Sequence, residues 1–174
     1  NTANPDGIAT SFDVTVIPDA REVSADSANV NLRIFHGVTD APTVDIKAQG
    51  VGTLVDNAPF RGFSGNLSVP AASYTIQIAP EAGTPEILAY QANIASLAGK
   101  SLLVLASGYI NPSGNPVGGQ NGPAFGLWAF TPSGDAIQLP TATSRVQIVH
   151  NAPNAPSVDI FAGSDKILSG VPFR

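Results

Sequence analysis

The chain has 174 residues, of which 43% are hydrophobic and 12% are charged. This length and apolar content allow a packed core in one domain, while the charged share is about half of that in an average globular protein. The net charge of −5, with only eight Lys and Arg, excludes a basic surface for nucleic acid. The absence of Cys excludes thiol catalysis, Cys-ligated zinc and redox roles.

The sequence also lacks any run of about 20 apolar residues, so we expect no membrane-spanning segment. A charged and then apolar signal segment is not recognisable either. Met is absent even at position 1, which predicts that the chain is a processed or excised piece.

Alternation of apolar and polar residues predicts many short strands and little helix. In SYTIQIA, the residues Tyr74, Ile76 and Ile78 share one face, as in a half-solvated antiparallel strand. SLLVLASGY is apolar on both faces, which predicts a central strand covered from two sides. The segment ILAYQANIASLAGK resembles a short helix, but we favour a strand and a turn at Gly99. The predicted strands are 12–18, 30–37, 43–48, 52–56, 63–69, 73–79, 85–94, 100–110, 124–131, 135–139, 145–150, 157–162 and 166–170.

One stretch of the chain nearly repeats itself. HGVTDAPTVDI at 36–46 returns as HNAPNAPSVDI at 150–160, a spacing of 114 residues, and the tripeptide PFR at 59–61 returns at 172–174 with a spacing of 113. The apolar positions of 13–23 also match those of 127–137. Such self-similarity indicates a tandem repeat. It predicts the tail of one repeat or a linking strand at 1–28, a complete repeat at 29–144 and the first strands of an incomplete repeat at 145–174.

Two explanations of the incomplete ends stay open. The chain is either a segment of a longer protein, or its ends pair with neighbouring chains by strand addition and build a filament. Seven to nine short strands per repeat are typical of an all-β, immunoglobulin-like antiparallel β-sandwich. The fold prediction is therefore one complete sandwich flanked by partial ones.

The two histidines are candidates for chemistry because each precedes a turn rich in Ala and Pro. One His in each repeat, without Cys, is too few for a metal site, and a His and a carboxylate without a nucleophile make no catalytic triad. We expect His36 and His150 to bond the turn backbone instead.

The aspartates of the repeated VDI motif, Asp45 and Asp159, are expected to face solvent as the outward residues of strands. The alternative is a calcium site, since Asp40 and Asp56 are close to Asp45 in the sequence. Calcium-binding loops, however, place several oxygen ligands within about a dozen residues, which is denser than the pattern here. Glu81 and Glu86 flank a turn, which does not suit the two carboxylates of a glycosidase cleft.

The remaining motifs give no site. The residues 66–68, NLS, match a glycosylation sequon that is common by chance, and Trp128 and Phe130 are predicted to lie in the core rather than to bind sugar. The sequence contains no GxSxG nucleophile elbow, no phosphate-binding loop motif and no HExxH zinc motif. We therefore predict no catalytic, cofactor-binding or metal-binding residues, no cofactor and no enzyme activity.

Four elements together resemble the domain of unknown function 4397 family. They are LRIFHGVTDAPTVDI with RVQIVHNAPNAPSVDI, LVDNAPF with ILSGVPF, VPAASYTIQI, and LAGKSLLVLASG, over residues 30–108 and 145–174. The chain departs from the family pattern at Ala72, at Leu102 and at 38–39, which affects local turn geometry. The resemblance implies a β-sandwich found in tandem on secreted or surface proteins of bacteria and some archaea, and it carries over no catalytic residue.

The function expected from the sequence is that of a non-catalytic, extracellular structural or spacer repeat module of a cell-surface or secreted protein. Its partners would be copies of itself or adjacent repeats, joined by strand addition into filaments. The alternative is an adhesin module that binds carbohydrate or another surface through the Gly- and Pro-rich loop 111–123. Surface glycans would then be the partner.

Overall fold

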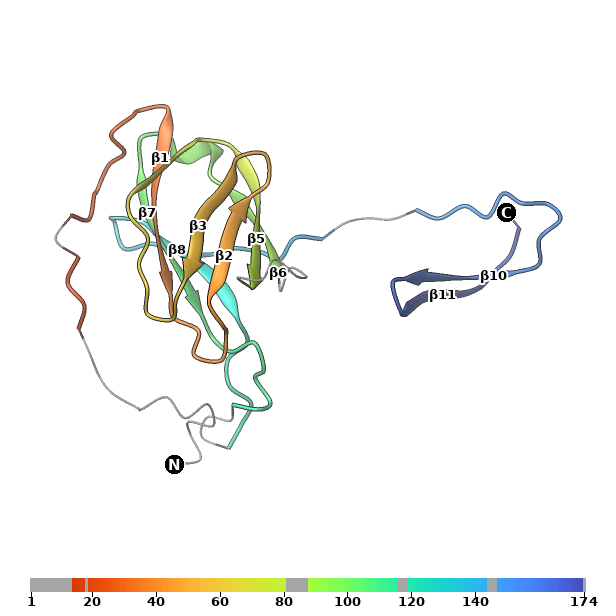
Figure 1. Ribbon diagram of the computed structural model, residues 1–174. Coiled ribbons are helices and arrows are strands. Elements are labelled where there is room, and N and C mark those ends of the chain that lie inside the picture. Colours follow the sequence, from red (N-terminus) through yellow and green to blue (C-terminus); the bar gives the residue numbers. More distant parts are fainter. Residues whose placement is uncertain (1–13, 18, 81–87, 116–118, 144–146, 174) are drawn as a thin grey trace. The chain divides into compact units, whose positions relative to one another are not determined.

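The computed structural model describes residues 14–17, 19–80, 88–115, 119–143 and 147–173 (Figure 1). Contacts divide the chain into two compact units, Asn1–Ala142 and Thr143–Arg174. The described residues form strands and a single short 3-10 helix, which confirms the all-β prediction. None of their helices has the length and apolar character needed to cross a membrane.

The first sheet of the larger unit has five strands in the order β4-β1-β7-β8-β9. Strands β1 and β7 pair in parallel, and the other neighbours pair antiparallel. The parallel pair departs from a purely antiparallel sandwich. It is allowed because the chain between β1 and β7 carries the whole second sheet, so no tight turn fixes their direction. The strands are β1 (Asn29–His36), β4 (Leu67–Pro70), β7 (Ser101–Ser107), β8 (Gly126–Phe130) and β9 (Ala136–Gln138).

The second sheet has four antiparallel strands in the order β3-β2-β5-β6. The segment for which a helix was the alternative forms β6, followed by the 3-10 turn η1 (Ala95–Leu97) and by Gly99 at φ 77°. The left-handed backbone at this position favours glycine, so the strand-and-turn prediction is confirmed. The strands are β2 (Val44–Ala48), β3 (Gly52–Ala58), β5 (Ser73–Pro80) and β6 (Leu88–Asn93).

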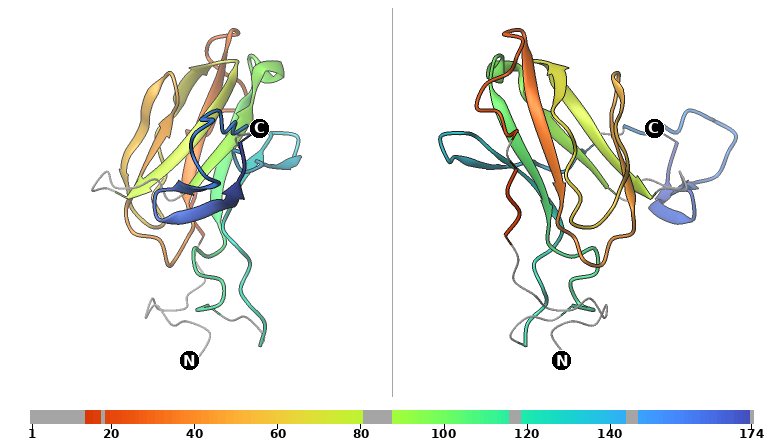
Figure 2. Two further views of the ribbon diagram at one scale, coloured as in Figure 1. Left: turned by 90° about the vertical axis from the view of Figure 1, so that its right-hand side faces the viewer. Right: turned by 60° about the vertical axis from the view of Figure 1, so that its left-hand side comes forward.

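The two sheets face each other and enclose the core, as the two layers in Figure 2 show. Ile34 and Leu127 of the first sheet belong to one buried cluster with Ile46 and Ile78 of the second. After β9 the chain crosses between the sheets. The N–H of Leu139 donates to Leu127 O at 2.9 Å, and the next carbonyl, that of Pro140, accepts from the β6 backbone at 2.8 Å.

The outer face of the five-stranded sheet is less covered than the sequence predicts. Strand β7 is central, as expected, but Leu103 on its outer face is 38% exposed. Trp128 and Phe130 also lie outside, half-buried, while their neighbours Leu127 and Ala129 fill the core. The prediction that the two aromatic residues belong to the core is therefore wrong.

Three predicted strands differ from the structure. Residues 14–17 and 147–150 form no strand, and the strand predicted at 63–69 begins only at Leu67. Alternation makes a strand only where a neighbour supplies ladder hydrogen bonds, and the first two segments have no such neighbour among the described residues. The rest of the predictions at 12–18 and 145–150 lies outside those residues.

The smaller unit contains one antiparallel hairpin, β10 (Val158–Ala162) with β11 (Asp165–Val171). Its large apolar side chains are open to solvent: Phe161 is 55% exposed, Ile167 54% and Leu168 45%. Among the described residues, neither buried apolar cluster includes a residue of this hairpin. The domain boundaries at 28 and 144 stay predictions.

Candidate functional site

His36 is buried at the end of β1 and bonds the turn that follows it. Its Nε2 donates to Pro42 O at 3.2 Å, and the N–H of Val38 donates to its Nδ1 at 3.3 Å. One ring nitrogen donates and the other accepts, which is the pattern of a neutral imidazole. The Phe60 ring lies edge-on to the His36 imidazole, with a distance of 6.2 Å between the ring centroids. The predicted structural role of His36 is confirmed.

Asp45 is buried, with 8% of its surface exposed, so the prediction of a solvated aspartate is wrong. Its Oδ1 accepts the backbone N–H of Asn57 at 2.9 Å, and Asn57 adopts a left-handed φ of 53°. The β2–β3 pairing shifts register around Ile46. Such a bulge re-aims side chains, so Asp45 points at the opposite strand rather than into water.

The β10–β11 hairpin reproduces the β2–β3 hairpin in detail. In β2–β3, Val44 pairs with Ala58, and Ala48 pairs with Gly52. The equivalent residues of the second copy pair in the same way in β10–β11, 158 with 171 and 162 with 165. The two register shifts also fall at matching places. The repeated sequence therefore encodes one local structure twice.

The polar contacts repeat as well. Asp159 Oδ1 accepts the N–H of Gly170 at 2.8 Å, and Gly170 has a left-handed φ of 62°. Hydrogen bonds from Lys166, from the Gly170 backbone and from Ser169 lower the pKa of Asp159. His150 lies 6.2 Å from the Phe173 ring, yet neither of its ring nitrogens has a partner among the described residues. The bond to the turn expected of His150 is not seen there.

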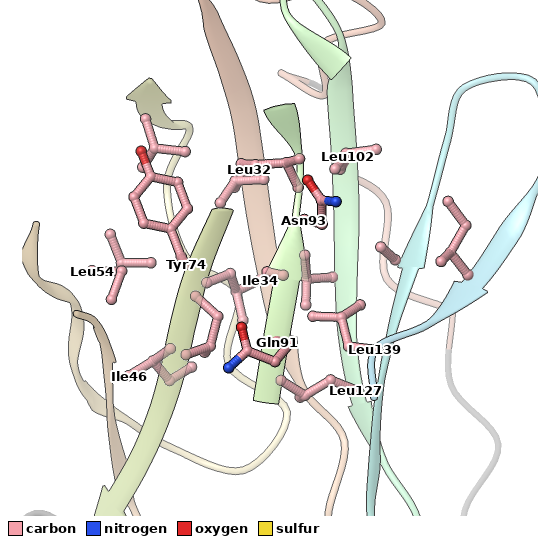
Figure 3. Close-up of a pocket in the computed structure, with 18 of the residues that line it drawn as sticks. Leu32, Ile34, Ile46, Leu54, Tyr74, Gln91, Asn93, Leu102, Leu127 and Leu139 are labelled. Carbon is pink, nitrogen blue, oxygen red and sulfur yellow. The ribbon is translucent and has the colours of Figure 1, made fainter. Parts of the chain in front are cut away.

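A cavity of about 200 Å³ lies between the two sheets of the larger unit (Figure 3). Leucine, isoleucine and valine side chains from both sheets form most of its wall. Three small side chains, Ala48, Ala92 and Ala129, also belong to the lining. The cavity reaches the surface at β9, where the lining residue Ile137 is 47% exposed.

An empty space of this size is costly for a small domain. At about 24 cal/mol per Å³, a fully closed void would destabilise the fold by about 5 kcal/mol. The whole free energy of unfolding of a domain is about 5–15 kcal/mol. The opening toward solvent reduces this cost, but the cavity still marks a departure from close packing.

These features lie in a region of the chain that matches a known protein family. Residues 30–117, which hold His36, Asp45 and most of the cavity wall, match the family model described as Domain of unknown function (DUF4397). The chain belongs to the DUF4397 family. The resemblance seen in the sequence is thereby confirmed over half of the chain. No curated protein and no solved structure matches it.

The DUF4397 match also includes the start of the 111–123 loop, which Asp40 anchors. The two carboxylate oxygens of Asp40 accept hydrogen bonds from Ile110 N at 2.9 Å, Asn111 N at 2.8 Å and Asn115 Nδ2 at 3.1 Å. Asn115 is buried by this contact. Sequence reasoning places Asp40 only near a turn, because its partners lie 70 to 75 residues away along the chain.

Replacing Asp40 by Ala should free this loop without unfolding the sandwich. Three donors lose their acceptor, so we expect faster amide hydrogen exchange at Ile110 and Asn111 while β1 and β7 stay protected. Asp40→Asn, which keeps one acceptor oxygen, is the control and should change exchange less. Equal protection in wild type and Asp40→Ala would contradict the anchoring role.

The other candidates do not come together. In the part of the chain that the structure describes, no three His, Asp or Glu side chains are grouped as metal ligands. Asp56 is exposed on β3 and takes no part in the hydrogen bonds described for Asp40 and Asp45. Glu81 and Glu86 lie outside the described residues. The sequon residue Asn66 bonds Asn31 Nδ2 at 3.2 Å.

Proposed function

We propose that this DUF4397 chain is a non-catalytic structural module of a secreted or cell-surface protein, built from copies of one sandwich fold. The copies contact one another through hairpins of the β10–β11 kind. The composition supports this role, since 12% charged residues and many Ser, Thr and Asn leave a surface suited to lie against similar surfaces.

One observation carries the proposal. The hairpin β10–β11 has the register, bulges and aspartate bond of β2–β3, but it exposes the apolar face that β2–β3 buries. Ile46 in β2 is 5% exposed, whereas its counterpart Ile160 is only half-buried. Leu168, the counterpart of the half-buried Val55, is 45% exposed. Covering such a face with further strands of the same fold is favourable at about 25 cal/mol per Å². Strand addition by another copy supplies such a cover.

Sedimentation of the 174-residue chain tests the contact between copies. We expect the average mass to rise with protein concentration and regular fibres to form in negative stain. Leu168→Ser should weaken association about tenfold. Val51→Ser, which changes an exposed residue of the first hairpin, should leave it unchanged. A chain that stays monomeric at high concentration would contradict assembly by strand addition.

Antibody labelling tests the location. Intact source cells, or their culture medium, should carry the protein without permeabilisation. Labelling that requires permeabilised cells would contradict a secreted or surface protein.

The alternative is an adhesin module that binds carbohydrate or another surface through the 111–123 loop. The hydrogen bonds that Asp40 accepts from Ile110, Asn111 and Asn115 favour it, because an anchored loop loses less conformational entropy on binding. Glycan-array binding that disappears when residues 113–121 are replaced by a short Gly-Ser turn would support this alternative.

A further inference from the structure

We propose that β10 accepts a further strand of the β5 type, running antiparallel to it, along the edge that β11 leaves unpaired. This pairing, which rests on the contact between copies proposed above, specifies the edge and the kind of strand that take part. It concerns the smaller unit alone, in which the described residues form a sheet of two strands (Figure 1).

The first hairpin shows which edge takes the strand. In the four-stranded sheet, β2 lies between β3 and β5, whereas β3 is the outermost strand. The second hairpin has the same register and the same bulges, so β10 corresponds to β2 and β11 to β3. Among the described residues, β10 pairs with β11 alone. The open edge of β10 therefore corresponds to the edge at which β2 holds β5.

The backbone groups at this edge are oriented for such a strand. In the first copy, the N–H of Gln49 donates to Thr75 O at 2.9 Å, and the register between β2 and β5 has no shift. Because amides alternate in direction along a strand, the N–H of Lys47 also faces β5. Phe161 holds the place of Lys47, and Asp159 lies two residues before it. Their N–H groups therefore face the open edge, where unpaired backbone groups can pair with another strand.

The inward side chains select a strand with apolar residues at alternate positions. In the first copy, Ile46 lies opposite Ile78, and the two are 5% and 4% exposed. Ile160 holds the place of Ile46 in β10 but is only half-buried. A strand of the β5 type would place an isoleucine opposite Ile160 and remove apolar surface from water, which is favourable.

The charge of Asp159 does not protect this edge. Charged side chains often keep an edge strand from pairing. Here the carboxylate accepts hydrogen bonds from Gly170 N at 2.8 Å, from Ser169 Oγ at 3.0 Å and from Lys166 Nζ at 2.7 Å. All three donors belong to β11, so the charge of Asp159 is directed away from the open edge.

One difference between the hairpins defines the sequence of the partner more closely. Lys47 lies opposite Gln77 in the first copy, and its counterpart in β10 is Phe161. Across neighbouring strands, aromatic residues pair favourably with aromatic or β-branched residues. We therefore expect the added strand to carry an apolar residue in the place of Gln77.

A folded copy does not present such a strand directly, because its β5 lies between β2 and β6. A copy donates β5 after this strand leaves its own sheet, as in domain swapping. A synthetic peptide with the β5 sequence needs no such step and is therefore the direct probe of the edge.

Amide hydrogen exchange of the full 174-residue chain, with and without a peptide of residues 71–80 (AASYTIQIAP), tests the edge. We expect the largest slowing at Asp159 and Phe161, by at least about tenfold. The slowing should be smaller at Ile160, whose amide faces β11 by the same alternation. Unchanged exchange at Asp159 and Phe161, or slowing confined to β11, would overturn the proposal.

Modified peptides test the direction of the pairing and leave the protein unchanged. N-methylation at Gln77 removes a donor that faces β10 and should weaken binding by about tenfold. N-methylation at Ile78, whose amide faces away from β2 in the first copy, is the matched control and should change binding little. Equal loss with both peptides would overturn the assigned edge. The Gln77→Val peptide should bind up to about fivefold more tightly, and weaker binding would overturn its pairing with Phe161.

Sedimentation of the same samples separates this edge from the assembly of copies. Self-association that depends on Leu168, without any effect of the peptide at β10, would overturn the edge and leave the contact between copies standing. Peptide binding by a chain that stays monomeric would support the edge and contradict the assembly of whole copies.

Discussion

Replacing Ile46 by Ala should lower the free energy of unfolding of the larger unit by about 2–5 kcal/mol. Ile46 is 5% exposed and belongs to the cluster that joins both sheets, so the shorter side chain enlarges the space between them. Urea unfolding followed by the fluorescence of Trp128, the only Trp, measures the change.

Ile160 provides the matched control, because it holds the same place in β10 that Ile46 holds in β2. Neither core cluster of the described residues includes Ile160, so Ile160→Ala should change the unfolding free energy by no more than about 0.5 kcal/mol. An equal loss at both positions would mean that the second hairpin is packed against apolar residues in solution.

This contrast explains what the repeated sequence predicts and what it does not. The repeat predicts local structure well, because hairpin register, bulges and the aspartate bond depend on residues close in the chain. Burial depends on the strands that pack against the hairpin, and these come from distant residues such as those of β7 and β8. Equal sequences thus give equal hairpins in unequal surroundings.

Alternation of apolar and polar residues does not predict which face of a strand is buried when both faces carry apolar residues. In β8 the sequence GLWAF offers Leu127 and Ala129 on one face and Trp128 and Phe130 on the other, and size alone favours the aromatic pair for the core. The structure buries the smaller pair instead. The cavity was beyond prediction for a related reason, since it reflects the summed volumes of side chains from several strands.

Asp45 shows the other limit of alternation. Between two inward residues, Val44 and Ile46, an aspartate is expected to face solvent, and only a bulge turns it inward. The signal for that bulge lies in the partner strand, at Asn57 and at its counterpart Gly170, two residue types that tolerate a left-handed backbone. A pattern confined to β2 does not contain it.

Asp45→Ala should destabilise the larger unit by about 1–3 kcal/mol, because the N–H of Asn57 loses its acceptor beside a largely buried position. The bond is local to the bulge, so we also expect faster hydrogen exchange at the Asn57 amide than at Ile46. Urea unfolding at neutral pH and amide exchange of the full chain measure the two effects.

Asp45→Asn separates the hydrogen bond from the charge. Asparagine keeps an acceptor oxygen at the same place, while Lys47 Nζ lies 4.0 Å from the other carboxylate oxygen, a distance at which a partly exposed pair contributes at most about 1 kcal/mol. The asparagine variant should therefore keep Asn57 protected and lose less stability than the alanine variant. Equal losses in both variants would assign the role of Asp45 to its charge, and the bulge would then be held by backbone pairing alone.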